Sequence, residues 1–82
     1  MSLAEVYRMK NDGNVAGLVA ALADDDEYVR RAAVQALAGF PDARVREILE
    51  RMRFEDPVAL VRTAATLAHA RVTAALLQKE ER

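Results

Sequence analysis

The sequence contains no cysteine, which excludes disulfide bridges, thiolate metal sites and a thiol nucleophile. The only serine, Ser2, lies at the capping position of a helix start, which argues against a Ser/His/Asp arrangement. His69 is the only histidine, so a metal site with two histidines is excluded. The three glycines lie far apart, which leaves no glycine-rich loop for phosphate binding. We therefore expect no enzymatic activity, no cofactor and no bound metal.

Charge of one sign and long apolar segments are also lacking. The formal net charge is -1, so no overall field draws nucleic acid or an anionic membrane. No apolar run approaches the roughly 18 residues of a membrane span, and the first residues do not resemble a secretion signal. We expect a cytoplasmic protein whose partners are neither nucleic acid nor membrane.

Two charged clusters call for a structural rather than a functional interpretation. The acidic run from Asp24 to Glu27 fits the positive end of a helix dipole better than a cation site, because consecutive residues point in different directions. A basic cluster at 44, 46, 51 and 53 is interleaved with glutamates, and Glu47 precedes Arg51 by four residues, the favourable order for an ion pair. We expect this second cluster to be a solvated helix face that pairs with itself.

What the sequence does have is alanine, within a pattern that occurs twice. Six residues recur with the same type at an offset of 32 residues (56 − 24). The first copy has Asp24, Val29, Arg30, Ala32, Ala33 and Ala36, and the second copy has Asp56, Val61, Arg62, Ala64, Ala65 and Ala68. Apolar residues inside each copy recur at helical spacing, and a period slightly above thirty residues is typical of stacked helical repeats. The pattern predicts an all-α fold, a short α-α superhelix of about five helices.

Turn and capping signals divide the chain, which we expect to be a single domain over 1–82. A leading helix over 2–10 begins with the capping-box spacing of Ser2 and Glu5, and Gly13 with Asn14 separates it from the next helix. A first repeat over 15–40 has a helix at about 15–23 and a second helix that opens within the acidic run 24–27 and ends in a Schellman-type stop at Gly39. A second repeat over 42–79 ends in an extended last helix that starts at Pro57.

These residues resemble the short HEAT-like repeats first named for bilin lyases, whose pattern is an apolar helix, L-x-D, a turn and V-R-x-x-A-A-x-x-L. Here Leu22-Ala23-Asp24 is followed by Val29-Arg30-Arg31-Ala32-Ala33, and the second copy has Asp56 followed by Val61-Arg62-Thr63-Ala64-Ala65. The resemblance implies a protein-binding scaffold more than an enzyme. The alternative is a lyase-like protein, or a subunit of one, that handles a bilin or another tetrapyrrole.

The same resemblance implies a structural ladder made of Asp24, Arg30, Asp56 and Arg62. In it, each arginine bonds to carboxylates or carbonyls of the nearby turns, and a planar guanidinium can satisfy several such acceptors at once. His69 stands where the first copy has Leu37, so we interpret it as a partly buried structural residue.

The last helix has a second apolar side. Leu60, Leu67 and Ala74 recur every seven residues, and Ala70 and Leu77 lie at the intervening spacing, which approximates the seam of a helix pair. These five residues are our candidate face for a partner protein or a second copy. Two alternatives stay open: the helix bends back over its own repeat, or Leu60 alone is buried against the preceding helix.

Overall fold

The computed structural model describes residues 1–80, and within that range the chain forms helices and no strand. The five helices, in order, are α1 (Leu3–Asn11), α2 (Val15–Ala21), α3 (Glu27–Leu37), α4 (Ala43–Glu55) and α5 (Ala59–Glu80). The all-α class and the number of helices agree with the prediction from sequence.

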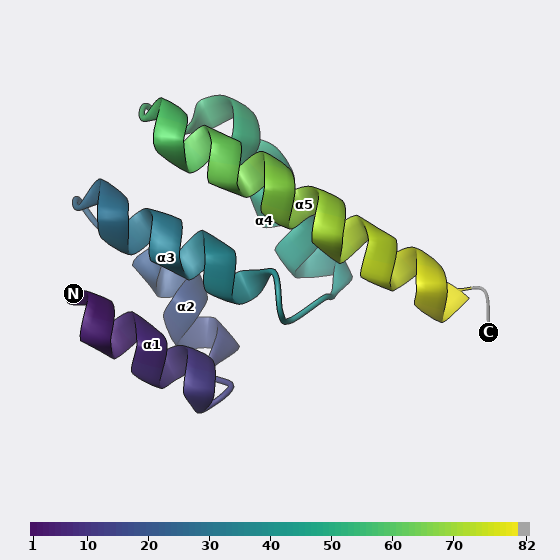
Figure 1. Ribbon diagram of the computed structural model, residues 1–82, viewed down its shortest axis with the longest axis horizontal. Helices are drawn as coiled ribbons and strands as arrows, with labels where there is room; N and C mark the ends of the chain where they lie inside the picture. Colours follow the sequence, from purple (N-terminus) through teal and green to yellow (C-terminus); the bar gives the residue numbers. More distant parts are fainter. Residues whose placement is uncertain (81–82) are drawn as a thin grey trace.

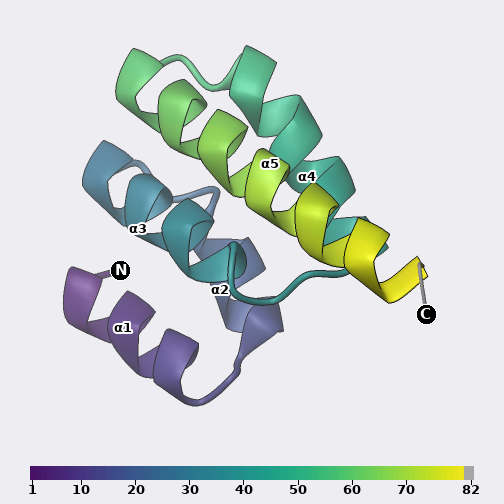
Figure 2. The same ribbon diagram turned by 45° about the vertical axis from the view of Figure 1, so that its right-hand side comes forward.

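The helices form two layers. In Figures 1 and 2, α1, α3 and α5 lie side by side and run in the same direction, while α2 and α4 form a second layer behind them. The main packing contacts join α3 to α1, α2 and α5, and join α4 to α5. The Cα atoms span 39 × 28 × 14 Å, the dimensions of a slab two helices thick. This is the helix-pair stacking of an α-α superhelix.

Polar side chains start the helices at the predicted signals. The Ser2 hydroxyl accepts from the Glu5 amide at 3.2 Å while the Glu5 carboxylate accepts from the Ser2 amide at 3.0 Å, so the predicted capping box is confirmed. Asn14 caps α2 through the Gly17 amide at 2.9 Å, directly after Gly13 with φ 68°. The third helix begins at Glu27, inside the acidic run as predicted, and Asp26 is its cap.

Three predicted helix limits are wrong. The last helix begins at Ala59 and not at Pro57, and two other helices end differently from the prediction. The helix predicted to reach residue 23 ends at Ala21, because the amides of Ala23 and Asp24 bond three residues back and close a turn. Gly39 does not form a Schellman stop, since Gly13 is the one residue with positive φ among those described. Instead, the Gly39 amide bonds to Ala36 O at 3.1 Å, and such three-residue bonds satisfy the last carbonyls of α3 without a left-handed residue.

Small aliphatic side chains fill the core. The alanine stripe of α3 is buried as predicted, and Ala33 and its counterpart Ala65 in α5 have no exposed surface. The larger side chains with no exposed surface include Leu18, Leu37 and Leu49, one from each of α2, α3 and α4. Alanine at the positions between the helices lets their axes approach closely, so a core with few aromatic residues still excludes water.

α1 and α2 approach closely at Gly17. A Cβ atom at this position would collide with Met9 Sδ from α1 and would come within 2.6 Å of the Asn14 side-chain nitrogen. The absence of a side chain therefore lets Met9 lie against the first turn of α2 while Asn14 keeps its capping position.

Candidate functional site

A buried ion pair joins the first helix pair, α2 and α3, to the second helix pair, α4 and α5. The guanidinium of Arg30, in α3, donates through Nε to Asp56 Oδ2 at 2.9 Å and through Nη2 to Asp56 Oδ1 at 3.2 Å. The Arg30 and Asp56 side chains are only 11% and 4% exposed. The Asp56 hydrogen bonds raise the pKa of Arg30 above its usual value. Because each of the two donors meets its own carboxylate oxygen, the geometry is the bidentate arrangement in which arginine and carboxylate bind most strongly.

The turns before α3 and α5 hold this pair in place. Asp56 lies between α4 and α5, and its Oδ1 also accepts from the Val58 amide at 2.9 Å, which fixes the carboxylate in a tight turn. Arg30 Nη1 donates to the carbonyls of Asp24 and Asp25 at 2.9 and 3.1 Å. One arginine therefore ties its own turn to the turn of the following helix pair.

The second arginine of the sequence pattern is only half engaged. Arg62 Nη1 donates to the Asp56 carbonyl at 2.7 Å, which repeats the bond from Arg30 to the Asp24 carbonyl. Among residues 1–80, no carboxylate meets the rest of the Arg62 fork. The structure thus places Arg30, Asp56 and Arg62 in one network but gives the two arginines different bonds.

Asp24 takes a different partner from its counterpart Asp56. Its Oδ2 accepts from the Met1 ammonium group at 3.0 Å and its Oδ1 from the Asp26 amide at 2.9 Å. The hydrogen bond from the Asp26 amide is the main reason why the pKa of Asp24 is lowered. Arg30 reaches the backbone of Asp24 and not its carboxylate.

The candidate face on α5 is uncovered. Leu60, Leu67 and Leu77 are 41%, 65% and 52% exposed, and Ala70 and Ala74 are exposed as well. α5 is one continuous helix that buries its opposite side, so it does not bend back over these residues, and Leu60 is not covered by the preceding helix. Leu67 and Ala70 also line a hollow of about 420 Å³ together with Gln35 and Ala38 of the α3 end, which extends the apolar surface beyond α5.

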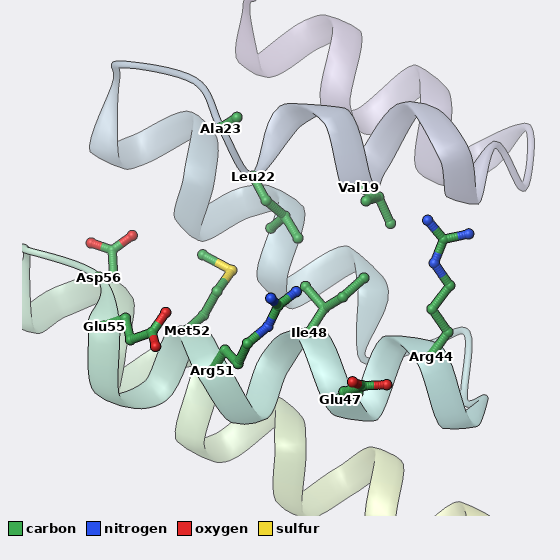
Figure 3. Close-up of a pocket in the computed structure, with 10 residues that line it drawn as sticks. All are labelled: Val19, Leu22, Ala23, Arg44, Glu47, Ile48, Arg51, Met52, Glu55 and Asp56. Atoms are coloured by element: carbon green, nitrogen blue, oxygen red, sulfur yellow. The ribbon is translucent and has the colours of Figure 1, made fainter.

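A groove of about 610 Å³ lies between α2 and α4 (Figure 3). Leu22, directly after α2, and Ile48 and Met52 of α4 project into it. The guanidinium groups of Arg44 and Arg51 lie on the side of α4 toward α2. The prediction of an ion pair between Glu47 and Arg51 is wrong, because no ion pair joins these two side chains among residues 1–80.

Glu50, Arg53 and His69 form a cluster that was not predicted from sequence. His69 Nε2 lies 2.8 Å from Glu50 Oε2, and Arg53 Nη1 lies 3.4 Å from both Glu50 Oε2 and His69 Nδ1. These contacts join α4 to α5, and they place the partly buried His69 in a structural setting. The signal in the sequence is the replacement of Leu37 by His69, which indicates a polar neighbour but not which one.

Within residues 1–80, no three His, Asp or Glu side chains are placed to hold a metal ion, and Asp24 to Asp26 serve the turn and cap of α3. None of the five described helices combines the length and hydropathy needed to cross a bilayer. The features described here are therefore a set of surfaces and one buried ion pair.

Two layers of paired helices, joined by an arginine that recurs at a fixed offset, define an α-helical repeat protein. The chain matches the sequence family described as HEAT repeats over residues 1–70, and it belongs to that family. Comparison with curated proteins and with solved structures gives no significant match. HEAT repeats are generally protein-interaction modules, and the family is generally non-enzymatic.

Proposed function

We propose that this chain binds another protein chain through the outer face of α5, and that it works as a non-enzymatic interaction module in the cytoplasm. The observation that supports the proposal is the exposure of Leu60, Leu67 and Leu77 on one side of one helix. Exposed apolar surface that is continuous, and not scattered, is typical of interaction sites. Ala70 and Ala74 lie between the leucines, where small side chains allow a second helix to come close.

The size of the exposed surface bounds the strength of the contact. Each leucine still exposes roughly half of its side chain, so its burial would contribute about 1 kcal/mol. The three together contribute about 3 kcal/mol, which is less than the roughly 4 kcal/mol or more that association costs in lost freedom of motion. A specific complex therefore needs further contacts beside the leucines.

Light scattering combined with size-exclusion chromatography tests the self-association form of the proposal. We expect the unmodified chain to form a dimer at micromolar concentration and the Leu67→Glu, Leu77→Glu double variant to be monomeric. Phe54→Glu is the matched control, because Phe54 is 66% exposed, as much as Leu67, but lies on α4. A chain that stays monomeric at high micromolar concentration excludes the second copy as occupant.

The hetero-association form has its own test. In affinity capture from the source cells, a specific partner should be retained by the unmodified chain and by Phe54→Glu, and lost with the double variant. If the three baits retain the same proteins, the α5 face is not the binding surface.

A further inference from the structure

We propose that the Arg62 side of α5 is a docking site for a partner helix that is preceded by an aspartate, with Arg62 binding the carboxylate of that aspartate. The inference rests on the proposed function, since it names the kind of segment that an interaction module would bind beside the α5 leucines. Its basis is an internal comparison: α3 already binds such a segment, namely Asp56 followed by α5.

The two arginines share one anchor, and Arg30 Nη1 has a second one at the Asp25 carbonyl. Arg30 Nη1 bonds to the carbonyl of Asp24, and Arg62 Nη1 bonds to the carbonyl of Asp56, each six residues earlier in the chain. This anchor holds the guanidinium plane at the turn and limits the rotamers that the long side chain can adopt. On Arg30, the groups left over by the anchor, Nε and Nη2, bind a carboxylate at 2.9 and 3.2 Å. On Arg62 the same two groups meet no carboxylate among residues 1–80.

The surface beside each arginine is also repeated. On α3, Val34 and the capping residue Ala38 follow Arg30 at four-residue spacing, on the side where Arg30 reaches Asp56, and both are buried. On α5, Thr66 and Ala70 follow Arg62 at the same spacing and are exposed. Threonine has nearly the shape of valine, so the surface that α5 offers to a partner helix is similar in shape to the surface that α3 offers to α5.

The hydroxyl of Thr66 does not interfere with such packing. Its Oγ1 donates to the Arg62 carbonyl of the same helix at 3.0 Å, so its hydrogen-bonding need is met inside α5. The one larger difference between the two surfaces is at Leu37 of α3, whose counterpart on α5 is His69. The His69 ring is held by Glu50. Docking on α5 therefore relies less on apolar burial than docking on α3 does, and more on the arginine.

The bound segment of this chain shows what the partner presents. Asp56 accepts from the amide two residues later and from the Arg30 fork at the same time, and a helix begins directly behind it. A partner that carries an aspartate in such a turn, followed by a helix with small apolar residues, would satisfy the Arg62 fork and lie along Thr66, Ala70 and Leu77.

A peptide with the sequence of residues 54–80 of this chain is the probe, because it contains Asp56 and the α5 segment in the register that α3 binds. Fluorescence anisotropy with the full chain measures its dissociation constant. We expect Asp56→Asn in the peptide to weaken binding about tenfold, and Arg62→Gln in the protein to weaken it by a similar factor. Combined, the two changes should weaken binding no more than either one alone, because they remove the same interaction.

Three results would overturn the inference. The first is no binding of the peptide. The second is equal binding of the unmodified peptide and its Asp56→Asn variant to the unmodified chain. The third is an Asp56→Asn effect that persists in Arg62→Gln, which would mean that the peptide replaces α5 and meets Arg30.

Arg62→Lys keeps the positive charge without the planar fork, and its thermal melt shows whether the fold is retained. Peptide binding could be insensitive to the Asp56→Asn change in the peptide and yet be lost in the Leu67→Glu, Leu77→Glu double variant of the protein. That result would support the proposed function and refute the carboxylate site. The oligomeric state and the capture experiment judge the proposed function separately.

Discussion

Arg30 and Arg62 offer a matched pair of substitutions, because both are anchored to the carbonyl of an aspartate six residues earlier and only Arg30 also holds a carboxylate. Lysine in either position keeps the charge and loses the fork. At Arg30 it removes two hydrogen bonds to a carboxylate that is 4% exposed, together with the bonds to the carbonyls of Asp24 and Asp25. Hydrogen bonds to charged groups contribute about 1.5–3 kcal/mol each. Since the lysine ammonium has three N–H donors and can restore most of these contacts but not the paired one, we expect Arg30→Lys to lower the free energy of unfolding by roughly 2–3 kcal/mol.

Arg62→Lys removes one bond to a carbonyl, so we expect a loss of about 1 kcal/mol or less. The difference of at least about 1 kcal/mol corresponds to a separation of melting temperatures of about 4–8 °C or more in a domain of this size. Circular dichroism during thermal and urea unfolding measures both variants, and Asp56→Asn should resemble Arg30→Lys. Equal losses for the two lysine variants would show that the ion pair between Arg30 and Asp56 contributes nothing beyond the shared anchor.

Three further changes test the packing and the caps. Ala33→Leu should cost about 1–3 kcal/mol, because Ala33 has no exposed surface; an unchanged melting temperature would place it away from a packed crossing. Gly17→Ala should not give the gain of about 1 kcal/mol usual within a helix, because the new Cβ meets Met9 and Asn14; a clear stabilisation in urea would contradict this. The pKa of Glu5 is lowered, chiefly by the hydrogen bond from the Ser2 amide. The contribution of the Glu5 carboxylate to the stability of the fold is therefore present above a pH of about 4 and is lost as the pH falls through the lowered pKa. Melting curves from about pH 6 to about pH 2 should therefore show a smaller acid-induced loss in Glu5→Gln, and an identical loss would remove the cap from the explanation.

The sequence was sufficient for the fold class because its signals are local. Ser2 and Glu5 mark a helix start within four residues, and the alanine stripe around Ala33 shows helical spacing within a single helix. The ends of helices were less predictable. Gly39 satisfies the rule for a left-handed helix end. Hydrogen bonds from an amide to the carbonyl three residues earlier end α3 equally well, and the local sequence pattern cannot distinguish these two solutions of similar energy.

The candidate site was predictable in its residues but not in its bonds. The repeated Asp and Arg selected Arg30, Asp56 and Arg62, yet the bond from Arg30 to Asp56 joins residues 26 apart and depends on how the helix pairs stack. The same limit applies to His69, whose partner Glu50 lies on another helix. The prediction that Leu60, Leu67 and Leu77 form a binding face remains a prediction, since their exposure leaves the occupant open.

The main helix contacts join elements no more than two places apart along the chain, and this has a consequence for folding kinetics. Short loops close at low entropic cost, so a chain built from neighbouring contacts reaches its transition state rapidly. Either helix pair can form first, after which its partner adds to an existing surface. The bond between Arg30 and Asp56 then adds to the packing of α3 against α5 in coupling the two halves, because the guanidinium is stable in its buried position only after the second pair has brought its carboxylate. Without it, the packing of α3 against α5 alone would couple the two ends of the slab, and we expect their amide hydrogens to exchange at less similar rates.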